Sequence, residues 1–322
     1  MNASHELDLD TGEAFTGRPT RALRRARMAD NLVTGLMWAA ALLLVVVLLA
    51  VVISLLAAGL PTWSIPFLFS AGTFLNPGIL PQIWVSFYTL ILTMVVVVPI
   101  GTGASIYLSE YAGPGRVTSV IRFSVEALAS VPSIVYGVFG SIVFLTNLQL
   151  GYSLLSGALT LALLNLPLMV RVGEEAIRSV PNSYREGSQA LAASKWETIR
   201  KVVLPSAMPG LLTAIVLTSG RIIGETAPLI LTMGTTISPN ARYSLNPLAT
   251  GETLAVQIWA IKSVGMPGVP RAQDVANGAA AVMLFIVLAI NVLVAVFNSR
   301  LQKRLQGGNL PPRAGSSKRG GG

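Results

Sequence analysis

Residues 32–58 read LVTGLMWAAALLLVVVLLAVVISLLAA and contain no charged side chain. A helix of about 20 apolar residues crosses the hydrocarbon core of a bilayer, so this run of 27 residues is long enough to span it. It is longer than the apolar region of a secretory signal peptide, which has about 7–15 residues, and no small-residue cleavage site follows it. We therefore predict a membrane-spanning helix that the mature protein keeps.

Apolar blocks of similar character recur along the rest of the chain. Hydrophobic residues make up 52% of the sequence and charged residues 11%, whereas an ordinary soluble domain has about 25% charged residues. A soluble protein would also spread its apolar residues at helix or strand spacing. The pattern predicts an all-α integral membrane protein with six transmembrane helices, the other five at about 83–108, 129–146, 153–170, 209–233 and 276–297.

Lysine and arginine are distributed unevenly between the two sides that six spans create. Of the 23 basic residues, 19 fall on the side of the two termini, three fall on the other side, and Arg221 falls within the fifth span. Because basic residues are retained in the cytoplasm, this distribution predicts that both termini are cytoplasmic. The net charge of +9 then indicates contact with anionic lipid headgroups, and no nucleic-acid partner is expected.

The predicted organisation has three parts. We expect a cytoplasmic N-terminal tail over residues 1–30, a transmembrane domain over 31–300 and a disordered cytoplasmic tail over 301–322. Within the transmembrane domain, residues 171–208 are expected to form a long cytoplasmic loop and residues 234–275 a long external loop.

Several kinds of chemistry are missing from the sequence. There is no cysteine, and the single histidine, His5, lies in the polar tail without neighbouring ligands, so we expect no metal site. A P-loop ends in Gly-Lys-Ser/Thr, but none of the five lysines follows a glycine. We therefore expect no catalytic residue and no cofactor in this chain. If ATP drives transport, the ATP and its Mg²⁺ bind to another subunit.

The 171–208 loop contains two short amphipathic segments separated by a turn. Such a pair at the membrane surface can dock in a groove of a partner and transmit movement. The loop resembles the ATPase-coupling loop of ATP-binding cassette (ABC) importer permeases. The residues that carry this resemblance are Glu186, Gly187, Ser188, Leu204 and Pro205, and Ala192 stands between them at a position where the pattern has another residue. A merely solvated hairpin is the alternative.

Ala192 occupies the position at which the coupling-loop pattern has glycine. Glycine permits a positive φ angle at a turn. Ala192 therefore either forgoes this conformation or adopts it at a cost of about 1 kcal/mol or more.

Three further segments resemble the permeases of the phosphate-specific (Pst) ABC importer. They are PIGTGASIYLSEY at 99–111, SVPSIVYGVFG at 130–140 and RIIGETAPL at 221–229, and the Gly-Glu-Thr-Ala-Pro sequence favours the PstA-type subunit. The resemblance covers roughly residues 83–235. It implies type I ABC importer architecture in a prokaryotic inner membrane. It also implies a PstC-type permease, a dimer of PstB-type ATPases and an external PstS-type phosphate-binding protein as partners.

Arg221 is the basic residue expected deepest in the membrane, because 12 residues of helix from Pro209 rise about 18 Å. An arginine there costs about 2.5–3.5 kcal/mol and should face the bundle interior or a wet path. Glu225 follows four residues later, on the same helix face. We expect Arg221 to contact phosphate, with Glu225 balancing its charge and Thr226 adding a hydroxyl. A purely structural ion pair is the alternative.

These observations predict a permease subunit that forms half of the path for inorganic phosphate and is not an enzyme. Arg171, at the end of the fourth predicted span, is either a second anion contact or an arginine that reaches the interface. A permease for another oxyanion, such as molybdate or sulfate, would share the coupling loop. A secondary transporter is the other alternative, but it should show more paired intramembrane acids than Glu225.

Overall fold

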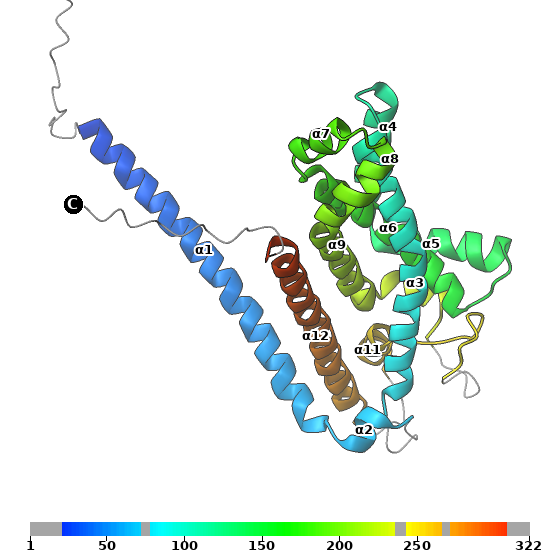
Figure 1. The fold of residues 1–322 in the computed structure, drawn as a ribbon. Coiled ribbons are helices and arrows are strands. Elements are labelled where there is room, and N and C mark those ends of the chain that lie inside the picture. Colours follow the sequence, from blue (N-terminus) through cyan, green and yellow to red (C-terminus); the bar gives the residue numbers. More distant parts are fainter. Residues whose placement is uncertain (1–20, 72–77, 236–242, 266–270, 308–322) are drawn as a thin grey trace, which may run out of the picture. The chain divides into compact units, whose positions relative to one another are not determined.

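Helices account for all regular structure in the parts of the chain that the computed structural model describes, which are residues 21–71, 78–235, 243–265 and 271–307 (Figure 1). Residues 1–20 and 308–322, which hold most of the two predicted tails, lie outside these ranges. The chain divides between Ser54 and Leu55 into two compact units. The first unit contains most of the first helix, and the second contains all of the elements that follow it.

Five of the described helices are long and apolar enough to cross a membrane. They are α1 (Arg21–Gly59), α3 (Leu80–Ile106), α6 (Leu154–Arg178), α9 (Leu204–Gly224) and α12 (Ala272–Gly307). A sixth span results if α4 (Arg116–Ser130) is taken together with α5 (Ser133–Gly140) and its extension, the π-helical turn η3 (Ser141–Asn147). The prediction of an all-helical protein with several membrane spans is confirmed, and six spans are reached when this bent pair counts as one.

The third predicted span starts at a sharp bend, because α4 and the helix formed by α5 and η3 are bent by 97° relative to each other. The bend lies at Val131 and Pro132, whose ψ angles are 132° and 138°. Proline lacks an N–H group and disfavours the helical conformation in the residue before it. The chain therefore leaves α4 at Ser130 and resumes a helix at Ser133, so that α5 and η3 cover most of the span predicted over 129–146 and start it four residues later.

Close packing of α3, α6 and α9 forms the centre of the second unit. A Cβ atom at Gly101 of α3 would lie 2.4 Å from Cγ of Met169 in α6, and one at Gly173 would lie 2.5 Å from the Ser105 hydroxyl. Ser105 also donates a hydrogen bond to the carbonyl of Val170 at 3.0 Å. Close backbone approach and side-chain hydrogen bonds of this kind hold helices together in a membrane.

The predicted external loop contains a helix that its composition does not indicate. α11 (Leu254–Ser263) starts after Thr253, whose hydroxyl accepts a hydrogen bond from the N–H of Val256, and it packs against α12 and α3. Leu254, Val256 and Ile261 are at most 1% exposed. This part of the loop therefore belongs to the protein core, as is common when a long connection carries structure of its own.

Short elements join the spans. η1 (Leu60–Thr62) and α2 (Ile65–Phe69) follow α1, the π-helical turn η2 (Tyr107–Tyr111) continues α3, and α10 (Ala227–Thr232) follows α9. Between α6 and α9 lie α7 (Asn182–Ala190), α8 (Lys195–Thr198) and the π-helical turn η4 (Ile199–Val203). Several spans extend beyond their predicted ends, because a helix that continues past the apolar stretch leaves no mark in hydropathy.

Candidate functional site

The fifth predicted span is interrupted where its charged residues lie. α9 ends at Gly224, Glu225 has an extended backbone with φ −72° and ψ 134°, and α10 starts at Ala227. Pro228 in the first turn of α10 cannot donate the hydrogen bond that a continuous helix needs there. The prediction of one helix over 209–233 is therefore wrong, because two helices meet at Glu225 and Thr226.

Arg221 and Glu225 form an ion pair at this break. Arg221 Nε lies 3.1 Å from Glu225 Oε1, and the two side chains are 35% and 15% exposed. Arg221 occupies the last turn of α9, where the negative end of the helix dipole favours a cation. The four-residue spacing thus brings the two groups together, although Glu225 itself is not helical and Arg221 does not lie in the middle of an unbroken helix.

The Arg221 guanidinium keeps most of its donors available. Nε donates to Glu225, whereas Nη1 and Nη2 have no hydrogen-bond partner among the described residues. A guanidinium carries five N–H donors, so the four on Nη1 and Nη2 remain. Oxyanions accept hydrogen bonds from such a planar fork in pairs. The pair can therefore receive an anion while the Nε bond to Glu225 persists.

Two further polar side chains lie beside the break. Tyr136 of α5 is 8% exposed, donates its hydroxyl to the carbonyl of Leu128 at 2.9 Å, and lies within Coulombic reach of the Arg221 charge. Thr226 precedes α10 and is half-buried, and its side chain makes no capping hydrogen bond. Tyr136 was not a predicted site residue, since a single tyrosine in an apolar segment gives no signal in the sequence.

Arg171 lies apart from this group in its contacts. It is exposed and sits within α6, about two turns before the end of that helix at Arg178. No contact in the described part of the chain joins it to Arg221 or Glu225. A role for Arg171 in anion binding stays a prediction.

The residues of the predicted coupling loop fall on α7, in the turn that α7 and α8 flank, and at the start of α9. Ser188 Oγ and Thr198 Oγ1 lie 2.9 Å apart and join α7 to α8. α8 begins with a capping box in which Ser194 and Glu197 satisfy each other's backbone N–H groups. The predicted residues are Glu186, Gly187 and Ser188 on α7, Ala192 in the turn, and Leu204 and Pro205 in the first turn of α9.

Ala192 adopts the left-handed conformation that its position demands, with φ at +59°. Of the two alternatives that the sequence leaves open, the chain therefore takes the strained one. The cost for a residue with a Cβ is about 1–2 kcal/mol. The turn that glycine provides in the coupling-loop pattern is thus preserved without glycine.

The segment formed by α7, the turn and α8 exposes three large apolar side chains to solvent. Leu191 is 85% exposed, Trp196 56% and Tyr184 53%. Docking of this segment into a partner, as opposed to a freely solvated hairpin, stays a prediction.

Glu252 is a buried acid that lies outside the candidate spans. The sequence alone gives no sign of its burial. It lies just before α11, is 5% exposed and receives a side-chain hydrogen bond from Gln82 of α3. Burial raises the pKa of Glu252 to about 7, and the bond from Gln82 opposes this only in part. A glutamate in a loop normally appears solvated, so only the position of α11 reveals it.

Comparison with known proteins identifies relatives that match most of the chain. Residues 98–307 match the family described as binding-protein-dependent transport system inner membrane component. A probable ABC transporter permease protein of Bacillus subtilis, YqgI, is 37% identical over 291 residues, which cover 87% of this chain and 98% of that protein. The phosphate transport system permease protein PstA of Mycobacterium leprae is 33% identical over 231 residues, covering 71% and 73% of the two chains.

Solved structures show a similar fold. A chain of a bacterial alginate ABC transporter, in complex with an alginate-bound periplasmic protein, superposes with a TM-score of 0.62 at 15% sequence identity. The superposition covers 88% of this chain and 98% of that one. At this level of identity the likeness concerns the arrangement of helices alone, which is that of a type I ABC importer permease.

Proposed function

The chain belongs to the family of binding-protein-dependent transport system inner membrane components, and we propose that it imports inorganic phosphate as the PstA-type permease of an ABC importer. It is a multi-pass membrane subunit of an ABC importer and a non-catalytic component. Family membership removes the alternative of a secondary transporter. The proposal concerns the cargo, the site that binds it and the partner subunits.

The unoccupied donors of Arg221 are the observation that carries the phosphate proposal. Nη1 and Nη2 make no hydrogen bond to a described residue, and the side chain is 35% exposed. Glu225 neutralises the guanidinium before cargo arrives, so the anion meets a preformed but partly shielded charge. An oxyanion can then bind to Nη1 and Nη2 beside Glu225, because its several acceptor oxygens match the paired N–H donors of the guanidinium.

The coupling segment, by which we mean residues 182–201 with α7 and α8, is the feature that favours a separate ATPase as the source of energy. In this proposal α7 and α8 dock in a groove of a PstB-type ATPase, and Leu191 and Trp196 fill part of it. ATP and Mg²⁺ bind to that subunit, and this chain holds no cofactor or metal. A PstC-type permease supplies the other half of the path, and a PstS-type protein delivers phosphate from outside.

The proposed location is the prokaryotic inner membrane, with both termini and residues 171–208 in the cytoplasm. This orientation follows from the excess of basic residues on that side of the chain. It places α7 and α8 where ATP is available. Permeases for molybdate or sulfate are the remaining alternative for the cargo, and similarity to PstA proteins favours phosphate over them.

Uptake by the reconstituted importer tests the site. Arg221→Met removes the guanidinium and is expected to lower phosphate uptake about 10- to 100-fold, because a hydrogen bond to a charged group is worth about 1.5–3 kcal/mol. Glu225→Gln leaves Arg221 without its counter-charge and is expected to slow release of phosphate. Arg116→Met, which removes an exposed arginine from α4, is the matched control and should transport normally.

Competition with other oxyanions tests the cargo. Phosphate uptake that an excess of sulfate or molybdate leaves unchanged supports the proposal, whereas suppression by either anion assigns the importer to that anion. The site proposal fails if the Arg221→Met and Glu225→Gln complexes assemble with all subunits and still import phosphate at the full rate.

A further inference from the structure

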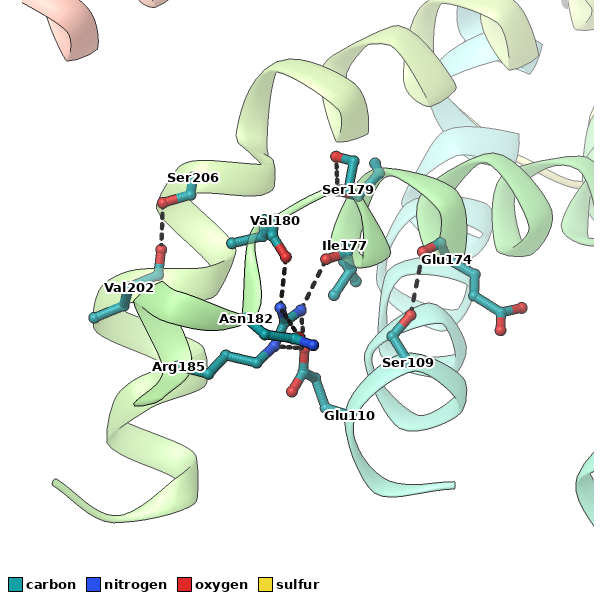
Figure 2. A network of polar contacts seen from close by, with 11 residues as sticks. Ser109, Glu110, Glu174, Ile177, Ser179, Val180, Asn182, Arg185, Val202 and Ser206 are labelled. Carbon is teal, nitrogen blue, oxygen red and sulfur yellow. Dashed lines mark hydrogen bonds and ion pairs between the residues drawn. The ribbon is translucent and has the colours of Figure 1, made fainter. Parts of the chain in front are cut away.

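Arg185 of α7 connects the coupling segment to two of the spans. Its Nη2 and Nε atoms lie 2.7 and 3.0 Å from Glu110 Oε1, in the turn η2 that ends α3. Its Nη1 donates to the carbonyl of Val180 at 2.6 Å, and Nη2 donates to that of Ile177 at 3.0 Å. Figure 2 shows the guanidinium lying between these groups. One side chain thus ties α7 to the ends of α3 and α6.

The Glu110–Arg185 ion pair is shielded from solvent. The arginine side chain is 18% exposed and the glutamate 8%, whereas the Lys201–Glu197 pair on the surface of the same loop is 72% and 48% exposed. Surface pairs are screened and contribute little, but a buried charge that loses its partner is left unsolvated. Separating Glu110 from Arg185 is therefore strongly unfavourable, and the two groups should move together.

The turn η2 also contacts the second coupling helix. Lys195 Nζ of α8 lies 4.9 Å from the centre of the Tyr111 ring, next to Glu110 in the chain. This is a cation–π contact of an exposed lysine and is weaker than the buried ion pair. Thus α7 contacts Glu110 and α8 contacts Tyr111, which are the last two residues of η2.

The position of η2 suits the transfer of movement. π-Helical turns are rare and occur frequently at functional sites, because the extra residue in the turn departs from the regular helix. η2 is continuous with α3, which packs against α6 and α9 in the centre of the bundle. A pull on Glu110 is therefore applied directly to the end of a central helix.

We propose that the Glu110–Arg185 ion pair is the joint that makes α3 move with α7 when the ATPase moves the coupling segment. Glu110 and Arg185 are positioning residues in this scheme, since they contact neither cargo nor ATP. The inference rests on the proposed function only in that an ATPase docks on α7 and α8. It does not depend on phosphate being the cargo.

A second ion pair nearby supplies a matched control. Arg122 Nε of α4 lies 2.9 Å from Glu174 Oε1 of α6, and Arg122 Nη2 donates to the carbonyl of Leu108 at 3.1 Å. The pair lies at the same ends of α3 and α6 as the joint, but none of its contacts in the described part of the chain involves α7 or α8. Arg122→Gln therefore removes a comparable arginine from the same region without touching the coupling segment.

The first measurement is cargo transported per ATP hydrolysed by the complete importer in liposomes. Arg185→Gln and Glu110→Gln are expected to lower this ratio about tenfold or more while ATP hydrolysis stays within about twofold of the unmodified complex. If the two residues act as one joint, the double variant falls no further than either single variant. Arg122→Gln should keep the ratio of the unmodified complex.

The second measurement follows the joint itself and is independent of cargo. Because the chain has no cysteine, spin labels can be attached at Gly103→Cys in α3, where nothing lies within 4 Å, and at Gln189→Cys in α7. We expect the distance between the labels to stay constant with and without ATP in the unmodified joint and in Arg122→Gln. In Glu110→Gln, which keeps the shape of the side chain, ATP should change that distance.

These outcomes separate the joint from the cargo proposal. If the unmodified complex imports no phosphate, the proposed cargo is wrong, and the label distances still test the joint. The joint is refuted if Glu110→Gln and Arg185→Gln keep both the transport ratio and the constant label distance.

Discussion

Replacing Glu252 with glutamine is expected to change how the stability of the protein depends on pH. The Glu252 carboxyl is buried between the start of α11 and α3, and burial raises its pKa to about 7 from the ordinary value of 4.5. Because the folded protein holds the proton more tightly than the unfolded chain, Glu252 favours folding at low pH. That contribution is fully present below pH 4.5 and is lost as the pH rises through about 7.

The size of the effect follows from the two pKa values. Each pKa unit corresponds to about 1.4 kcal/mol, so the difference between 4.5 and about 7 corresponds to about 3 kcal/mol. Glutamine has nearly the same shape and no charge at any pH. At pH 8, Glu252→Gln should therefore be more stable than the unmodified protein by up to about 3 kcal/mol. At pH 5 the two proteins should differ much less.

Thermal unfolding of the purified protein in detergent, followed from pH 5 to pH 8.5, measures this difference. The unmodified protein should lose part of its unfolding temperature across this range, and Glu252→Gln should lose distinctly less. Glu126→Gln, which removes an exposed carboxyl from α4, is the control and should follow the unmodified protein. Equal pH dependence of Glu252→Gln and the unmodified protein would refute the assignment of a buried, protonated carboxyl.

Three further substitutions test the packing and the turn. Gly101→Ala places a Cβ 2.4 Å from Met169 Cγ and should destabilise the protein by about 1–3 kcal/mol, whereas Gly103→Ala meets nothing within 4 Å and should be neutral or slightly stabilising in the same unfolding assay. Ala192→Gly relieves the left-handed strain of the turn between α7 and α8. The free energy of local unfolding of residues 182–201 should therefore rise by up to about 1 kcal/mol, which slows their cleavage by protease. Uptake should stay unchanged. Faster cleavage of Ala192→Gly would contradict the strain argument.

The membrane spans were predictable because their signal is compositional. A run of 27 uncharged residues announces α1 without any knowledge of its neighbours. Breaks within apolar segments were not predictable in the same way. The interruption at Glu225 falls inside the segment 209–233 that reads as one apolar span, and the bend before Ser133 falls within the span predicted over 129–146. Prolines 132 and 228 mark both places, but Pro99 lies inside the continuous helix α3.

Whether a candidate site was predictable depends on whether its residues are close together in the sequence. The Arg221–Glu225 contact follows from a spacing of four residues, so the sequence was sufficient to propose it. Glu110 and Arg185 are 75 residues apart, and only the folded chain, which places α7 near the turn η2, brings them together. Glu252 was not predicted because it lies in a loop by sequence, and its burial becomes apparent only from the packing of α11 against the rest of the protein.

The π-helical turn η4 determines how α8 is rotated about its axis relative to α9. Side chains advance by about 100° per residue in an α-helix, and the extra residue in a π-turn shifts the angular phase between the helices on either side of it. α8, which exposes Trp196, and α9, which buries Leu211, are therefore oriented separately. Deleting one residue from 199–203 would rotate α8 by about 100° against an unchanged α9. A single insertion or deletion at this point would thus change the direction in which Trp196 faces while the packing of α9 stays the same.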